Sequence, residues 1–170
     1  MGERLLLRPL AEPDRAALYA VAADRELWAL HPAHHRWQRP VFDALFDDAL
    51  AQGGALAVIE RASGRMMGSS QYRASGKVPG AMEIGWTFLA RHHWGGAANR
   101  ELKRLMLSHA LAAVERVVFR VGAGNLRSRR AMEKIGGRLM ELTEDVSYPD
   151  GRVVAHVFYE IDRASFAAGP

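Results

Sequence analysis

One segment, residues 82–116, joins a strand-like run to a long amphipathic helix through the turn WGGAAN at 94–99. Glycine and alanine let a backbone turn tightly and approach a ligand closely. The first amides of a helix have no partner within the helix, and a pyrophosphate satisfies such amides well. The sequence therefore predicts a phosphate-binding unit of strand, turn and helix, and the rest of the fold must place this unit.

The composition limits the kinds of protein that this chain can be. A length of 170 residues is typical of one domain with its own core, so we expect a single domain over residues 1–170. The absence of cysteine excludes disulfides, thiolate nucleophiles and cysteine metal sites. The first residues lack the apolar core of a signal peptide, and no run approaches the roughly 18 apolar residues of a membrane span. We therefore expect a cytoplasmic protein that makes no contact with a membrane.

Positive charge is concentrated in one part of the chain. The net charge is +4, but residues 91–138 contain eleven Arg or Lys against three Glu. This asymmetry indicates an anionic ligand or a nucleic acid on one face, or else a solvated helix surface. A nucleic-acid surface is the weaker interpretation, because only Trp94 and Phe119 could stack on bases within the basic stretch.

Hydrophobic periodicity predicts an α+β fold. Helical spacing appears at residues 16–23, 41–51, 99–116 and 126–135, and strand patterns at 3–9, 55–60, 66–73, 82–90, 117–121, 138–146 and 153–161. This order predicts a mixed sheet flanked by helices. A Rossmann fold is excluded because G-x-G-x-x-G is absent, and a Walker A loop is excluded because no Gly-Lys-Ser/Thr closes the turn.

Three motifs carry a resemblance to a known family. They are EIGW at 83–86, WGGAANRE at 94–101 and NLRSRRAMEKIG at 125–136. Together with the element order, they make the chain resemble the GNAT superfamily of acyl-CoA-dependent N-acetyltransferases over nearly its whole length. Residues 3–10 add a similarity to the branch of the ribosomal-protein N-terminal acetyltransferases RimJ and RimL. The resemblance implies acetyl-CoA as the acyl donor, and a mostly antiparallel sheet with helices on both faces.

The resemblance also implies where coenzyme A binds. One strand edge would pair with the pantetheine arm, the glycine turn would hold the pyrophosphate, and the helix after residue 125 would lie beside the thiol. Two basic residues one helical turn apart could reach the CoA phosphates. The expected cofactor-binding residues are Phe88, Leu89, Ala90, Trp94, Gly95, Gly96, Ala97, Ala98, Asn99, Arg100, Asn125, Ser128, Arg130 and Lys134. The family's Gln/Arg-x-x-Gly-x-Gly/Ala turn is altered here, with Trp94, Ala97 and Asn99 at its defined positions.

The family's proton donor is missing from its expected position. Many GNAT enzymes place a tyrosine general acid in the helix that follows the asparagine, where this chain has Met132. Methionine cannot donate a proton. By resemblance to RimL-like members, Ser128 becomes the candidate donor to the leaving thiolate. The alternative is that Ser128 is only a capping or first-turn hydroxyl beside Asn125.

Acetyl transfer also needs a base, and Glu83 is the candidate. Period-two alternation puts Glu83, Gly85, Thr87 and Leu89 on the face opposite Met82, Ile84, Trp86 and Phe88. The alternative is an ion pair with an arginine on a neighbouring strand, such as Arg73. Without cysteine, direct attack of the amine in a ternary complex is the simplest mechanism. The oxyanion would be stabilised by a backbone N–H near Leu89.

The acceptor is predicted to be a primary amine, either a peptide N-terminus or a small molecule. An α-amine with a pKa of about 7.9 is roughly 10% neutral at pH 7, whereas lysine is below roughly 0.1%. A weak base therefore serves an α-amine better. The aromatic and imidazole groups expected to line its entrance are Trp28, His31, His35 and Trp37.

Three further interpretations concern metals, activity and assembly. No metal is expected, because the paired histidines lack acidic partners at ligand spacing. The missing tyrosine leaves a second function open, a CoA-binding sensor or regulatory module with little or no transfer activity. A homodimer is possible if the apolar strand at 153–161 pairs with a second copy.

Overall fold

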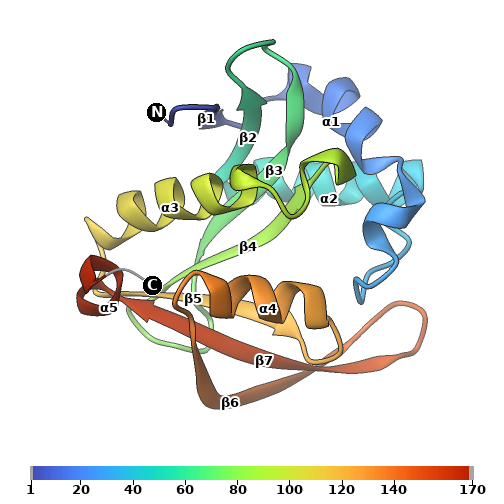
Figure 1. Ribbon diagram of the computed structural model, residues 1–170. Helices are drawn as coiled ribbons and strands as arrows, with labels where there is room; N and C mark the ends of the chain where they lie inside the picture. Colours follow the sequence, from blue (N-terminus) through green and yellow to red (C-terminus); the bar gives the residue numbers. More distant parts are fainter. Residues whose placement is uncertain (1, 169–170) are drawn as a thin grey trace.

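The computed structural model describes residues 2–168 and contains one seven-stranded sheet. The strands follow the order β1-β2-β3-β4-β5-β7-β6, and only the β4–β5 pair among the described strands is parallel. This mixed, mostly antiparallel sheet confirms the predicted fold class (Figure 1). The strands are β1 (Leu5–Pro9), β2 (Ala55–Glu60), β3 (Met66–Ala74), β4 (Met82–Leu89), β5 (Arg116–Gly122), β6 (Arg138–Ser147) and β7 (Val153–Asp162).

Helices cover both faces of the sheet. The helices are α1 (Arg15–Ala22), α2 (Arg39–Gln52), α3 (Ala97–Leu111), α4 (Leu126–Lys134) and α5 (Arg163–Ala168). Leu102 and Met106 of α3 and Met132 of α4 pack against one face, whereas Phe42 and Phe46 of α2 pack against the other. Figure 1 shows α3 and α4 on the same side, with α2 behind the sheet. No helix within residues 2–168 is long and apolar enough to cross a membrane.

A bulge in β4 overturns the predicted alternation of its side chains. Trp86 has a φ of 53°, and the β3–β4 register shifts between Ser69 and Gln71. An extra residue in one strand reverses the facing of every residue after it. Ile84 and Leu89 therefore both pack on the α3 side, while Phe88 packs on the α2 side. The prediction that Ile84 and Phe88 share a face is wrong for this reason.

Two other expectations need correction. The helix predicted over 99–116 begins earlier, at Ala97, and ends at Leu111, because Arg116 already opens β5. The strand expected to pair with a second copy, β7, lies inside the sheet, with β5 on one side and β6 on the other. Dimerisation through β7 is therefore wrong, since its two hydrogen-bonding edges are already used.

Candidate functional site

β4 and β5 separate soon after they meet. Their parallel pairing consists of Met82 with Val117 and Glu83 with Val118, and it goes no further. From residue 84 to residue 89, the edge of β4 that faces β5 therefore lacks a strand partner among the described residues. An unpaired strand edge offers N–H and C=O groups to an extended ligand.

Leu89 shows which of its groups are available on that edge. The amide of the next residue, Ala90, donates to Met67 on β3 at 2.8 Å. Successive residues of a strand direct their backbone groups to opposite sides, so the Leu89 N–H points toward the β5 side. The Leu89 carbonyl accepts a hydrogen bond from Trp94 Nε1 at 2.9 Å. The Leu89 N–H thus remains the donor that this edge offers to a ligand.

The start of α3 offers further amides. Its N-cap is Gly96, which has no side chain to cap the helix, and the preceding Gly95 has a φ of 69° that favours glycine. The first turn carries no acidic residue. Glu101 turns away from the helix start, because its Oε1 accepts from the amides of Arg4 and Leu5 at 3.0 and 3.3 Å. The first-turn amides of α3 can therefore bind an anion, with the helix dipole favouring it.

An arginine missed by the sequence analysis links this turn to α4. The Arg127 guanidinium lies 3.8 Å from the centre of the Trp94 ring and donates to the Leu27 carbonyl at 3.4 Å. Burial lowers the pKa of Arg127. Its contact with Trp94 holds the glycine turn and the beginning of α4 close together, so both helix starts lie at one mouth of the β4–β5 separation.

The first turn of α4 has an ordinary cap. Asn125 is buried, and its Oδ1 accepts from the Ser128 amide at 3.2 Å, which makes it the N-cap. This bond accounts for the Asn125 carbonyl oxygen and leaves its NH₂ group and the Ser128 hydroxyl to act on a ligand. Arg130 and Lys134 are exposed on α4, where phosphates could reach them.

Glu83 is the last residue of β4 that pairs with β5, and its side chain lies on the face away from α3. It is 8% exposed, and its Oε1 is 3.5 Å from Arg120 Nε on β5. Burial raises the pKa of Glu83, and the charge of Arg120 partly offsets this effect. Arg120 is shared with Glu144 on β6, at 3.0 Å. A buried carboxylate with a raised pKa is suited to accept a proton near neutral pH.

The alternative predicted for Glu83, an ion pair with an arginine on a neighbouring strand, does form, but its partner is Arg120 of β5 and not Arg73. Arg73 is the cross-strand neighbour of Glu83 on β3. It nevertheless pairs with Asp48 at 2.5 Å and lies 4.0 Å from the centre of the Trp86 ring. Sequence spacing gave no reason to prefer Arg120 to Arg73 as this partner.

The loop between α1 and α2 packs near the end of β5 on the same face as Glu83. A Cβ on Gly122 would lie 2.7 Å from the ring of Pro32, so this contact requires glycine. His31 Nδ1 accepts from the Ala33 amide at 2.9 Å, and burial followed by the charge of Arg36 lowers the pKa of His31. His31 is therefore neutral at pH 7. Its Nε2 lies 3.3 Å from Arg36 Nη1, so both ring nitrogens have partners within the described residues.

The aromatic residues predicted for that entrance are placed differently from one another. Trp28 is 2% exposed, donates from Nε1 to the Ala22 carbonyl and packs against Phe88, so it belongs to the core. Trp37 is partly buried, and its carbonyl accepts from the Tyr19 hydroxyl. Trp28 therefore supports the loop between α1 and α2 from the core.

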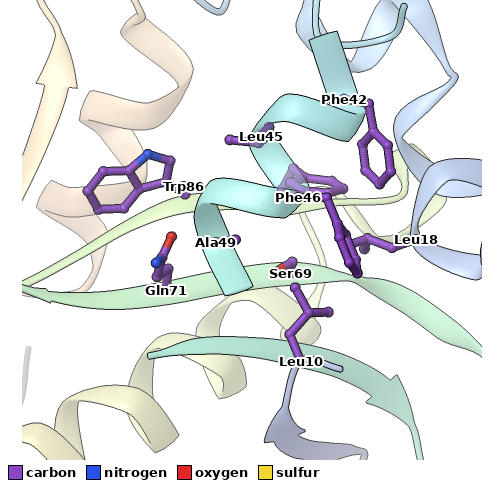
Figure 2. A pocket seen from close by; sticks show the side chains of 10 residues that line it. Leu10, Leu18, Phe42, Leu45, Phe46, Ala49, Ser69, Gln71 and Trp86 are labelled. Atoms are coloured by element: carbon purple, nitrogen blue, oxygen red, sulfur yellow. The ribbon is translucent and has the colours of Figure 1, made fainter. Parts of the chain in front are cut away.

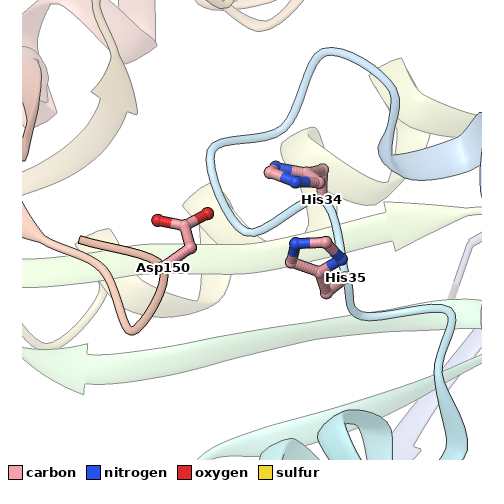
Figure 3. Close-up of side chains that lie close together, drawn as sticks. All are labelled: His34, His35 and Asp150. Carbon is pink, nitrogen blue, oxygen red and sulfur yellow. The ribbon is translucent and has the colours of Figure 1, made fainter. Parts of the chain in front are cut away.

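His35 belongs to a small surface cluster with His34 and Asp150 (Figure 3). Their potential ligand atoms lie within 4.8 Å of one another, so the loop before α2 meets the β6–β7 turn here. Arg152 lies in the same cluster, 2.7 Å from Asp150 and 2.9 Å from His34 Nδ1. Arg152 joins the loop to the β6–β7 turn through its contacts with His34 Nδ1 and the Pro32 carbonyl.

A separate apolar cavity lies between α2 and the sheet (Figure 2). Phe42 and Phe46 of α2 and Trp86 and Phe88 of β4 are among the residues that line it. Its volume of about 20 Å³ accommodates at most one water molecule. It is a gap in packing beside the β4 bulge.

Lys103 is the second residue that the sequence analysis missed. It lies on α3 three residues before Met106 and four before Leu107, and hence on the buried stripe, with 3% exposure. Its Nζ donates to Thr87 Oγ1 at 2.7 Å, and burial lowers the pKa of Lys103 to about 7. The sequence does contain a signal for this residue, because a lysine stands at a position of the apolar stripe.

Burial of Lys103 predicts how stability changes with pH. Its folded pKa of about 7 is below the ordinary value of 10.5, so the unfolded chain binds more protons between these values. This group therefore destabilises the fold below pH 7, and stability rises as pH increases from 7 to 10. Lys103→Met should remove this rise and stabilise the protein by about 2 kcal/mol at pH 7. Thermal melts from pH 7 to 10 check this, and a wild-type slope in the variant would contradict it.

A family model described as an acetyltransferase (GNAT) domain matches residues 4–138. A probable GNAT-family acetyltransferase from Chromobacterium violaceum is 22% identical, with a TM-score of 0.84 over 98% of this chain and 87% of that one. A GCN5-related N-acetyltransferase from Brucella melitensis is also 22% identical, with a TM-score of 0.78 over 99% and 80%.

A third solved structure contains ligands. It is spermidine N-acetyltransferase from Vibrio cholerae in complex with CoA and spermine, which is 13% identical to this chain. Its TM-score is 0.69, over 96% of this chain and 98% of that one. At this identity the likeness concerns the fold. Because the family model matches most of its length, the chain belongs to the GNAT acetyltransferase family.

Proposed function

We propose that this protein transfers the acetyl group of acetyl-CoA to a primary amine. One observation carries the proposal. Among the described residues, the β4 edge without a strand partner is followed along the chain by the uncapped start of α3. A single ligand that has an extended amide arm and a diphosphate can therefore bind to both. Coenzyme A has this chemistry.

Each part of the donor then has a place in the proposal. The pantetheine arm pairs with the backbone of Phe88, Leu89 and Ala90, and the diphosphate accepts hydrogen bonds from the amides at residues 94–100. Asn125 and Ser128 flank the arm from α4. Arg130 and Lys134, which are exposed on that helix, are proposed to contact phosphate groups.

The chemistry is direct attack in a ternary complex. The neutral amine adds to the thioester carbonyl carbon, and the Leu89 N–H stabilises the oxyanion. Glu83 takes the proton of the amine, directly or through a water molecule, from the face of the sheet opposite α3. The Ser128 hydroxyl can hydrogen-bond to the departing sulfur. Since no cysteine is present, no acyl-cysteine intermediate forms.

The acceptor is proposed to be a protein N-terminal α-amine, as in the RimJ and RimL branch, or a small amine. Glu83 lies at the base of the β4–β5 separation, and the loop with His31 and Trp37 flanks the same face. The raised pKa of Glu83 makes it a stronger base than an ordinary carboxylate, but it is still weaker than an amine, which suits an acceptor amine of low pKa. The proposed location is the cytoplasm.

The proposal is tested by thiol release. Purified protein with acetyl-CoA is incubated with a panel of peptides and small amines, while free CoA is measured and acetylated products are identified by mass spectrometry. Turnover with at least one primary amine supports the proposal. Binding of acetyl-CoA without turnover over the whole panel would indicate a sensor, and absence of binding would reject the CoA site itself.

A further inference from the structure

The ammonium group of Lys103 bridges the two strands where they separate. It is 2.7 Å from Thr87 Oγ1 on β4 and 5.2 Å from the centre of the Phe119 ring on β5. Phe119 directly follows the last β5 residue that pairs with β4. The charge therefore lies on the α3 side of the gap, next to the β4 edge assigned above to the pantetheine arm.

This ammonium lacks the partners that a buried cation normally has. An ammonium has three N–H donors, and within residues 2–168 Lys103 uses one of them, to Thr87. It joins none of the ion pairs among the described residues. Thr87 is also hydrogen-bonded to Ser70, whose Oγ lies 2.7 Å from Thr87 Oγ1. A buried charge is costly without an anionic partner. The two other N–H groups of Lys103 are therefore available to an anionic group that a ligand supplies.

The groups that face Lys103 from neighbouring elements do not titrate near neutral pH. They are the hydroxyls of Ser70 and Thr87, the ring of Phe119 and, farther along β3, Tyr72, which donates to the Met106 carbonyl and has a pKa raised by burial to about 12. Burial is the sole cause of the lowered pKa of Lys103. Among these groups, only Lys103 changes its charge near neutral pH.

We propose that Lys103 is the proton donor to the departing thiolate of coenzyme A. This role rests on the proposed function. Lys103 would donate the proton that a tyrosine donates in many GNAT enzymes and that Met132 cannot donate. Met132 is buried among the apolar residues of the α3 side, so α4 offers no acid at that position. A cation at the strand gap stabilises the thiolate by charge as well as by proton donation.

The proton balance of the step closes. The amine nitrogen bonds to the carbonyl carbon, the carbon–sulfur bond breaks, and the sulfur takes one proton from the Lys103 ammonium. The acceptor nitrogen gives one proton to Glu83. The products are an amide and a free thiol. Glu83 then releases its proton to solvent and Lys103 regains one, so no net proton is consumed.

The test measures the thiol of bound coenzyme A and needs no turnover. Thiolate formation is followed by ultraviolet absorbance during pH titration of the CoA complexes of wild type and Lys103→Met. A thiolate beside Lys103 supplies the anionic partner that keeps the ammonium protonated, so the coupled pair should lower the thiol midpoint by at least about one pH unit relative to Lys103→Met. Arg104→Met, at the exposed neighbouring position of α3, is the matched control and should titrate like wild type.

Kinetics supply a second readout. Lys103→Met should lower kcat about tenfold while binding of acetyl-CoA changes less than threefold, because a thiolate leaves with moderate ease unaided. Equal thiol midpoints in wild type and Lys103→Met would overturn the inference and leave the proposed function intact. Should Lys103→Met not fold, a wild-type midpoint at or above that of free CoA would overturn it equally. If CoA does not bind to wild type, the proposed function fails first.

Discussion

Glu83→Gln is expected to lower kcat/KM for amine acetylation by about 10²- to 10³-fold, with little change in acetyl-CoA affinity. Glutamine preserves the shape of the side chain but cannot accept a proton, and a positioned base contributes roughly 10² to 10⁴ to a rate. In wild type, kcat/KM should rise with pH as Glu83 ionises, through a pKa that burial has raised above its ordinary value. Steady-state rates from pH 5 to 9 measure both effects.

A matched control separates the base from its ion-pair network. Glu144 shares Arg120 with Glu83, at 3.0 Å, and its charge raises the pKa of Glu83. Glu144→Gln should therefore keep the maximal rate within about threefold and shift the rising limb to lower pH. If Glu83→Gln instead behaves like Glu144→Gln, Glu83 belongs to the network alone and the base must be sought elsewhere.

Gly96→Asp is expected to weaken coenzyme A binding by roughly two orders of magnitude while it slightly stabilises the protein. The backbone at Gly96 is extended, with a φ of −90°, and a Cβ there would lie 3.7 Å from the His93 carbonyl, so aspartate fits. Aspartate is a better N-cap than glycine, and the cap together with the helix dipole should add about 0.5 kcal/mol of stability. The same carboxylate occupies the α3 amides and repels a diphosphate, so the Kd for CoA should rise roughly 10²-fold.

The opposite signs of the two effects make this variant informative. Calorimetric titration gives the Kd and a thermal melt gives the stability. Gly76→Asp adds the same charge in open space on the β3–β4 loop and should change neither quantity appreciably. Retention of wild-type CoA affinity by Gly96→Asp would show that the diphosphate does not use the start of α3.

The sequence predicted most of the elements because their patterns are local. The stripe of Leu102, Met106 and Ala110 follows directly from helical spacing, and the strand at Ala55–Glu60 has the predicted bounds. The bulge at Trp86 was not predictable, because it depends on how β3 and β4 pair. A period-two pattern has no means of showing an inserted residue.

Site residues divided along the same line. The small residues of the glycine turn stood out in the sequence, because the close approach of a backbone to a ligand restricts residue type locally. Arg120 and Arg127 did not, because their partners Glu83 and Trp94 come from distant segments. Lys103 could have been found, since a lysine on an apolar stripe breaks the pattern of its own helix.

The most direct test of the central claim is amide hydrogen exchange with and without coenzyme A. Binding along the β4 edge and at the start of α3 predicts slower exchange at residues 87–90 and 96–100, with the Leu89 amide among those most protected. Residues 55–60 of β2, which β3 separates from β4, should be unchanged. Tight binding of coenzyme A that leaves exchange at residues 87–90 and 96–100 unaltered would contradict the account.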